Sequence, residues 1–202
     1  MVYPKKAYFK DYIFHVDEHV YEPAEDTFLI AEKMAVEEDD VVLDVGTGCG
    51  ILAVLAAEKA KSVVAVDINP HAIECASRNA ETNGAREKID FRHGDLFQPL
   101  KKNERFSLIL FNSPYLPSEP DEESSWIGKA WAGGPDGRQV IDRFIADAPC
   151  WLADGGRILL VQSSLSDVNR TLKLFNERNL RATVVAQVKV PFESIVLVEA
   201  QC

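Results

Sequence analysis

A polar tetrapeptide, Asn112-Ser113-Pro114-Tyr115, directly follows the apolar run 106–111. Such a run is typical of a buried strand, so the tetrapeptide is expected at the edge of a sheet. The side-chain oxygen of Asn112 and the backbone carbonyl of Ser113 would offer two hydrogen-bond acceptors beside the flat ring of Tyr115. An amide or amino nitrogen could be held between them.

A glycine turn lies upstream of this tetrapeptide. The strand-like run 41–45 leads into Gly46-Thr47-Gly48-Cys49-Gly50 and then into an apolar segment with helical spacing. Glycines at such a turn let the backbone pass close beneath a ligand, although a plain strand-to-helix corner has the same pattern. Asp67 ends the next apolar run, about 20 residues later, where a carboxylate can bind both hydroxyls of a ribose. Both NAD and S-adenosylmethionine satisfy this pattern.

Asp44 distinguishes between these two cofactors. It lies two residues before Gly46, where a carboxylate would repel a pyrophosphate but attract a cationic amino-acid tail. Asp95 and Leu96 follow the run 89–92 and could meet the edge and the face of an adenine ring. The glycine turn and these carboxylates therefore favour S-adenosylmethionine, and the tetrapeptide then favours methyl transfer to nitrogen.

The whole chain sets limits on these interpretations. Its 202 residues fit a single domain, with residues 1–24 as an N-terminal extension or hairpin. The apolar stretches are shorter than the roughly 20 residues of a membrane span, and no signal core follows the first lysines, so we expect a cytoplasmic protein. The four cysteines form no CxxC pair, which argues against a metal site. A net charge of −10 disfavours duplex DNA as the main ligand.

The order of apolar runs and helical segments predicts an α/β fold with a doubly wound, Rossmann-like sheet of seven strands. We expect strands near 41–45, 62–67, 88–93, 106–111, 156–162, 181–190 and 193–200, and helices near 25–36, 50–59, 70–82, 138–152 and 166–177. The last two strands are joined by so short a link that they must pair antiparallel.

Two other regions carry expectations of their own. Alternating segments at 8–14 and 15–20 predict a hairpin before the first helix. The segment 116–137 has no clear periodicity, and a loop of this length is usually functional or mobile. Trp126, Trp131 and Phe144 are expected to be packing residues.

The motifs together resemble a known family. The strings 44–50, 67–70 and 112–115, with Asp95, resemble the class I S-adenosylmethionine-dependent methyltransferases of the HemK type. Two further strings, VYEPAEDT at 20–27 and AWAGGPDGR at 130–138, resemble the eukaryotic and archaeal branch of that family. This branch methylates the N5 nitrogen of the glutamine in the GGQ motif of class I translation release factors.

The resemblance implies a sheet ordered 3-2-1-4-5-7-6 with strand seven antiparallel. It implies no metal, a catalytic group of Asn112, Ser113, Pro114 and Tyr115, and a cofactor site of Thr27, Asp44, Gly46, Gly48, Gly50, Asp67, Asp95, Leu96 and Asn112. It also implies a small zinc-containing activator protein, for which the edge strand 88–93 is the expected docking element. Ser113 replaces the usual proline and retains the backbone carbonyl.

Other functions remain open from the residues alone. An adenine-N6 nucleic-acid methyltransferase would present the same two donors to Asn112 and Ser113, but the acidic charge and the absence of a DNA-recognition domain argue against it. A protein-lysine methyltransferase would need a base, and none is evident. A scaffold without catalysis or an NAD-dependent oxidoreductase would account for the glycine turn but not for the tetrapeptide.

Overall fold

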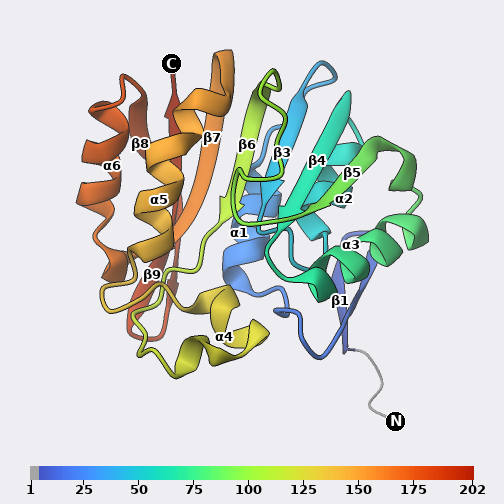
Figure 1. Ribbon diagram of the computed structural model, residues 1–202, viewed down its shortest axis with the longest axis horizontal. Helices are drawn as coiled ribbons and strands as arrows, with labels where there is room; N and C mark the ends of the chain where they lie inside the picture. The colour runs from blue at the N-terminus through green and yellow to red at the C-terminus, as the bar shows by residue number, and fades with distance from the viewer. Residues whose placement is uncertain (1–4) are drawn as a thin grey trace.

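The computed structural model describes residues 5–202, so the first four residues of the predicted extension 1–24 lie outside the described residues. Figure 1 shows a central sheet with helices on both faces and a separate two-stranded hairpin. The strands are β1 (Lys5–Phe9), β2 (Tyr12–Val16), β3 (Val41–Val45), β4 (Ser62–Asp67), β5 (Ile89–His93), β6 (Phe106–Asn112), β7 (Leu152–Ser163), β8 (Arg181–Val190) and β9 (Glu193–Gln201). The α-helices are α1 (Glu25–Lys33), α2 (Ile51–Ala57), α3 (Pro70–Thr82), α4 (Trp126–Trp131), α5 (Gln139–Asp147) and α6 (Val168–Asn176).

The seven-stranded sheet has the order β5-β4-β3-β6-β7-β9-β8. Numbered along the chain within this sheet, that order is 3-2-1-4-5-7-6, as the family resemblance implied. β9 runs antiparallel to both β7 and β8, and the described pairings among β3 to β7 are parallel. The carboxyl ends of the parallel strands therefore meet at one edge of the sheet.

The central strands are apolar along their whole length because helices cover both faces of the sheet. Leu43 of β3 and Leu108, Ile109 and Leu110 of β6 are fully buried. α1 packs behind the sheet while α5 and α6 lie in front of β7, β8 and β9 (Figure 1). α3 begins as predicted, with the side chain of Asn69 accepting a hydrogen bond from the backbone N–H of His71 at 3.0 Å.

Two predicted helices end at least three residues before the expected position. The segment predicted as one helix at 138–152 divides into α5 and a 3₁₀ turn, Ala148–Trp151. Pro149 explains the division, because it has no backbone N–H and disfavours the α conformation in the residue before it. The helix predicted at 25–36 ends at Lys33, because Met34 adopts an extended backbone.

The fifth strand of the sheet starts earlier than predicted. β7 begins at Leu152, and the residues before 157 form an irregularity within the strand, where the pairing with β6 shifts between Phe106 and Leu108. Gly155 lies in this stretch with φ of 72°, a conformation that favours glycine. The extra residues bend the strand without ending it.

The predicted N-terminal hairpin is present, but its turn is misplaced in the prediction. β1 pairs antiparallel with β2, and Phe9 faces Tyr12. The chain therefore turns at Lys10 and Asp11, within the segment 8–14 that was expected to be one strand. Lys10 adopts a left-handed φ of 51°. Glycine usually marks such a turn in a sequence, and position 10 is a lysine.

The segment 116–137 contains a short helix that the sequence did not predict. α4 has six residues, and Ser125 caps it by accepting a hydrogen bond from the backbone N–H of Gly128 at 2.9 Å. Leu116 bridges to Ala132, and Ser118 receives the backbone N–H of Gly134 on its hydroxyl at 3.0 Å. These bonds tie the two ends of the loop together below the sheet edge (Figure 1).

Candidate active site

A cavity of about 570 Å³ lies at the carboxyl ends of β3, β4 and β6. The chain moves outward from β3 to β4 and β5, then returns to the other side of β3 with β6. Ligands of open α/β sheets bind at such a reversal of strand order. The volume is in the range of sites for small molecules and cofactors.

The glycine turn forms one wall of this cavity. Gly46 and Gly48 line it, with left-handed φ angles of 66° and 56°. Gly50, with φ of 85°, does not line it, in contrast to the prediction. A Cβ at Gly50 would lie 2.8 Å from the Cβ of Ala76, so this glycine allows α2 and α3 to pack closely.

Asp67 lines the cavity at the end of β4 and has partners on both oxygens. Its Oδ2 accepts the backbone N–H of Gly48 and its Oδ1 that of Asn69, each at 2.8 Å. Each carboxylate oxygen retains a second lone pair, so the group can still accept hydrogen bonds from two hydroxyls. Burial raises the pKa of Asp67 above its ordinary value.

Asp95 and Leu96 also line the cavity, at the turn after β5. Oδ2 of Asp95 pairs with the guanidinium of Arg143 on α5 at 2.5 Å. Arg143 lines the cavity too, although no motif in the sequence marked it. An exocyclic amine that bound to Asp95 would therefore share the carboxylate with Arg143.

Asp44 occupies a different place from the one predicted. Its carboxyl is fully buried, and it is absent from the cavity wall. Oδ2 accepts a hydrogen bond from the hydroxyl of Thr47 at 2.6 Å, whereas Oδ1 has no hydrogen-bond partner within residues 5–202. Burial, the largest cause, raises the pKa of Asp44 to about 7. Asp44 thus supports the glycine turn from within and does not contact the cavity.

The amide of Asn112 has a defined orientation. Its Nδ2 donates to Oγ1 of Thr27 at 3.1 Å, and the hydroxyl of Thr27 donates to Oδ1 of Asp26 at 3.1 Å. The hydroxyl hydrogen of Thr27 is thereby used, so its oxygen must act as the acceptor for Asn112. Oδ1 of Asn112 is buried without a donor, and the residue lines the cavity. An amide oxygen without a donor among the described residues is therefore held in a fixed direction at the end of β6.

Tyr115 is fixed by the same carboxylate. Its hydroxyl donates to Oδ2 of Asp26 at 3.1 Å, and the hydroxyl of Tyr21 donates to the same oxygen at 3.3 Å. Burial, with the charge of Asp26, raises the pKa of Tyr115 well above its ordinary range, so the phenol stays neutral. The sequence did not identify Asp26 or Tyr21 as site residues, although both belong to the string 20–27.

Ser113 and Pro114 complete the tetrapeptide, and both line the cavity. The hydroxyl of Ser113 donates to the carbonyl of Val161 on β7 at 2.7 Å. This hydrogen bond restrains the segment where the resembling family has a proline ring. The serine therefore retains a restraint of a different kind as well as the backbone carbonyl.

The remaining candidates divide between wall and core. Trp126 and Trp131, expected as packing residues, line the cavity from α4, whereas Phe144 is fully buried against Phe111 with ring centroids 4.5 Å apart. Cys49 lines the cavity, but burial raises the pKa of its thiol to about 12, which rules out a thiolate at neutral pH. Within residues 5–202 no group of three or more histidine, cysteine, aspartate or glutamate side chains could hold a metal ion.

Comparison with known proteins identifies the class. The methyltransferase small domain family matches residues 22–127. A putative protein N5-glutamine methyltransferase of Methanocaldococcus jannaschii is 39% identical, covering 90% of this chain and 91% of the relative. Methyltransferase HEMK2 of Homo sapiens is 33% identical, covering 81% of each chain. A ribosomal protein uL3 glutamine methyltransferase of Bradyrhizobium diazoefficiens is 39% identical, covering 76% of this chain and 54% of the relative.

A solved structure agrees in fold. The E. cuniculi Mtq2-Trm112 complex, described as responsible for methylation of the eRF1 translation termination factor, has a chain with a TM-score of 0.72 and 24% identity. The match covers 91% of this chain and 98% of that one. The fold and the cavity define a class I methyltransferase. The chain belongs to the methyltransferase small domain family, and the predicted resemblance to HemK-type enzymes is confirmed.

The buried carboxyl of Asp44 predicts a pH effect on stability. Its pKa rises from 3.8 to about 7 on folding, so the folded protein holds this proton more tightly than the unfolded chain. The resulting stabilisation is complete below about pH 4 and is lost as the pH rises through about 7. The melting temperature of the wild-type protein minus that of Asp44→Asn, both without cofactor, should therefore decrease as the pH rises from 4 to 8. Each kcal/mol of lost stabilisation corresponds to about 2–4 °C in this difference.

Asp67 shifts in the same direction but is present in both proteins, so its contribution largely cancels in the difference. Melting followed by circular dichroism at several pH values would measure the effect. A difference that stays constant with pH would show that Asp44 is ionised in the folded protein.

Proposed function

We propose that this protein is an S-adenosylmethionine-dependent methyltransferase that acts on the N5 nitrogen of the glutamine in the GGQ motif of a class I release factor. The observation that carries the proposal is the fixed amide of Asn112, whose Oδ1 has no donor among the described residues, together with Tyr115, which is held by the same Asp26. Names of relatives that describe glutamine methylation support the same chemistry. We also infer a single cytoplasmic domain, and within residues 5–202 no helix is long and apolar enough to span a membrane.

The cavity wall fits S-adenosylmethionine. Asp67 has free lone pairs for ribose hydroxyls, Leu96 offers an apolar face, and the glycine turn allows close approach of the backbone. The residues that would hold the cofactor are Thr27, Gly46, Gly48, Asp67, Asp95, Leu96 and Asn112. When bound, the cofactor supplies a methyl group activated by a positively charged sulfur.

The chain's own contribution is to orient the nucleophile. A primary amide nitrogen is weakly nucleophilic, because its lone pair is delocalised into the carbonyl. The side-chain oxygen of Asn112 and the backbone carbonyl of Ser113 would accept its two N–H groups and direct the nitrogen toward the methyl group. Each such bond contributes about 0.5–1.5 kcal/mol, whereas correct orientation can contribute roughly 7–11 kcal/mol. Alignment is therefore the main contribution.

A strong base is not required in this scheme. The nitrogen becomes acidic only after it has gained the methyl group, and its proton can then leave to water. Tyr115 is neutral because its pKa is raised, and its ring would stack on the planar amide. Asp26 already accepts hydrogen bonds from Thr27, Tyr21 and Tyr115, so it serves to orient these groups.

The net charge of the chain and the substrates named for its relatives distinguish among the possible nitrogen substrates. The net charge of −10 opposes the phosphate contacts that an adenine-N6 methyltransferase needs. A lysine would arrive protonated and would need a base. A glutamine of ribosomal protein uL3, the substrate in the name of one relative, is the competing protein substrate.

The acceptor of Asn112 gives the first test of the proposed function. Asn112→Ala should lower methyl transfer to a recombinant release factor by more than 100-fold, because alignment of the amide is lost. Calorimetric affinity for S-adenosylmethionine should stay within a few fold. Transfer is measured with labelled cofactor, with the GGQ glutamine replaced by alanine as the negative control and uL3 as the competing substrate.

Ser113→Ala is the matched control, since it removes only the bond to Val161 and keeps the backbone carbonyl. Its effect should be modest. Transfer of labelled methyl to the alanine-substituted release factor would refute the proposed target. Transfer to uL3 alone would identify ribosomal protein uL3 as the substrate instead. Equal loss of transfer and of cofactor binding in Asn112→Ala would assign the residue a structural role.

The carboxylate of Asp26 gives a second test. In Asp26→Asn the amide nitrogen cannot accept the hydrogen bonds that Thr27 or the two tyrosines now donate. The amide of Asn112 then loses its fixed orientation, so kcat for the release factor should fall about 10- to 100-fold while cofactor affinity changes little. Steady-state kinetics and calorimetry measure the two quantities separately.

Glu25→Gln, on the same helix and exposed, is the control and should keep wild-type kcat. A rise in KM with unchanged kcat in Asp26→Asn would place Asp26 in substrate binding instead of orientation.

We further propose that the outer edge of β5 receives a small activator protein by strand addition. β5 pairs only with β4 in the described sheet, which leaves its other side free of a strand. Arg92 is paired with Asp90 and bidentately with Glu104, each at 2.7 Å, and such charges protect an edge from unwanted pairing. The complex of similar fold names a second protein, Trm112, and this name supports a partner protein for the chain.

Hydrogen exchange tests the edge directly. Co-expression with such a small zinc-binding partner should slow exchange of the backbone amides of Ile89–His93, because a new strand would accept their hydrogen bonds. The opposite edge strand, Arg181–Val190, is the internal control and should exchange as in the free protein. Protection at the second edge alone would refute the assignment.

A further inference from the structure

A fully exposed aromatic side chain projects from the turn between β8 and β9. Phe192 has 101% relative exposure, the largest value among the exposed hydrophobic residues described. An isolated exposed apolar residue needs no explanation, but a fully solvated phenylalanine in a turn gains nothing from burial. The backbone conformation of Phe192 is also uncommon for an aromatic residue.

The turn itself favours a different residue. Val190 pairs with Glu193, so Pro191 and Phe192 alone connect the two strands. Phe192 has a left-handed φ of 74°, which glycine adopts without strain and an aromatic residue does not. Local stability therefore does not account for phenylalanine at this position. Residues that violate a local rule are often retained for a function.

The strand register places this turn at the same edge of the sheet as the active site. Asn112 pairs with Val161 of β7, and Val161 pairs with Leu197 of β9. The chain from Leu197 back to Phe192 therefore extends past the carboxyl end of β6, two strands away from Asn112. Figure 1 shows the β8–β9 turn at the lower end of the sheet, the end where α4 lies.

The turn is held against the segment that follows β7. The carboxylate of Glu193 accepts a hydrogen bond from Ser163, and the backbone N–H of Ser194 donates to the hydroxyl of Ser164 at 3.0 Å. Leu165, in the same segment, is 56% exposed. Two exposed apolar side chains thus stand on segments bonded to each other, and we name Leu165 and Phe192 the docking ledge.

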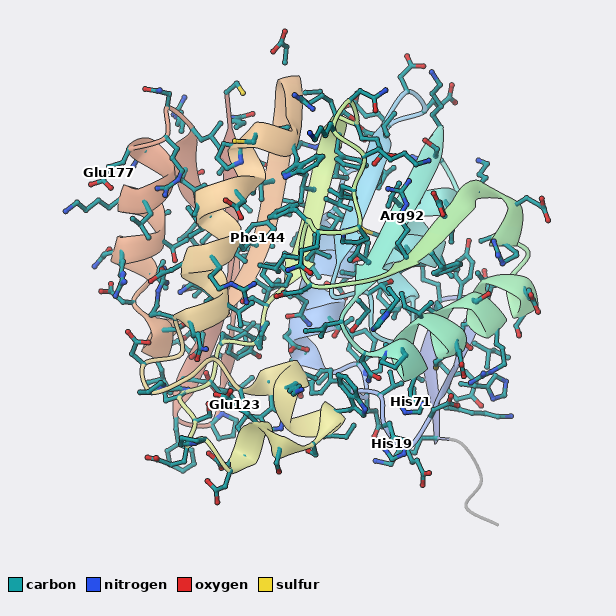
Figure 2. All side chains as sticks on the ribbon, in the orientation of Figure 1. His19, His71, Arg92, Glu123, Phe144 and Glu177 are labelled. Atoms are coloured by element: carbon teal, nitrogen blue, oxygen red, sulfur yellow. The ribbon has the colours of Figure 1, made fainter. Side chains whose placement is uncertain are left out.

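Charges of both signs lie near the docking ledge: the exposed Lys189 is three residues before Phe192 on β8, and acidic residues lie on the side toward the active site. Glu193 follows Phe192, and its charge is close enough to contribute to the raised pKa of Tyr115. The loop that starts after Tyr115 carries Glu119, Asp121, Glu122 and Glu123, and Glu123 lines the cavity. Figure 2 labels Glu123 beside α4 at the same end of the molecule. A partner that covers the ledge would present apolar groups bordered by lysine or arginine.

We propose that the docking ledge binds the folded domain of the protein substrate, at an apolar surface with a basic border near the loop that carries the target glutamine. The inference rests on the proposed function and adds a contact outside the cavity. The anchored turn presents Phe192 in advance, so little conformational freedom is lost when the substrate binds. Duplex nucleic acid does not fit an acidic border.

Phe192→Gly separates docking from folding. Glycine suits the left-handed φ, so the variant should keep or raise the melting temperature. For the intact release factor KM should rise about tenfold with kcat nearly unchanged, as for truncation of an aromatic anchor at an interface. A short peptide containing the GGQ motif is too small to reach the ledge, so its kcat/KM should be the same for variant and wild type.

Val185→Thr is the matched control, because Val185 is 46% exposed and lies in the middle of the edge strand β8. It should leave both substrates unaffected. Equal KM values of Phe192→Gly and wild type for the intact protein would overturn the docking ledge while leaving the proposed function intact. If wild-type enzyme methylates neither peptide nor protein, the proposed function fails, and the docking inference fails with it.

Discussion

The carboxylate of Asp26 is the group on which the geometry of the candidate site depends. It accepts hydrogen bonds from the hydroxyls of Tyr21, Thr27 and Tyr115 and from the backbone N–H of Thr27. Its two oxygens have about four lone-pair directions, so all four donors can be served. Because the hydroxyl hydrogen of Thr27 is donated to Asp26, Asn112 must donate to Thr27 through Nδ2, and this fixes which way its amide is turned. A residue of α1 thus determines which way the side-chain amide of Asn112 on β6 is turned.

This relation requires α1 to be fixed against the sheet, and the N-terminal hairpin contributes to that. The ring of Phe9 on β1 stacks on Phe28 of α1 with centroids 5.9 Å apart. Asn79 of α3 is buried and donates through Nδ2 to the carbonyl oxygens of His15 and Cys49, each at 2.8 Å. The hairpin therefore packs on the helix that holds Asp26 and is linked through Asn79 to the glycine turn. The hairpin therefore helps to hold the residues of the candidate site in place.

The sequence predicted the parallel core well, because buried parallel strands are continuous apolar runs and their ends carry polar residues that meet at one edge. Asp67 and Asn112 could be placed for this reason, whereas the strand order came from resemblance. Asp26 was missed because its role exists only through contacts from other elements. Asp44 was misplaced because a motif does not tell whether a side chain faces the ligand or the interior. Lys10 turns the hairpin without the glycine that would have marked it.

Two buried oxygens without donors, Oδ1 of Asp44 and Oδ1 of Asn112, differ in how their cost can be relieved. An unsatisfied buried acceptor costs about 1–3 kcal/mol. Asp44 can reduce that cost by taking up a proton, in line with its raised pKa of about 7. The amide of Asn112 cannot be protonated, and the bond to Thr27 prevents it from turning. No described residue donates to Oδ1 of Asn112, so a ligand N–H group that reached this oxygen would relieve a cost that the folded chain cannot relieve by itself.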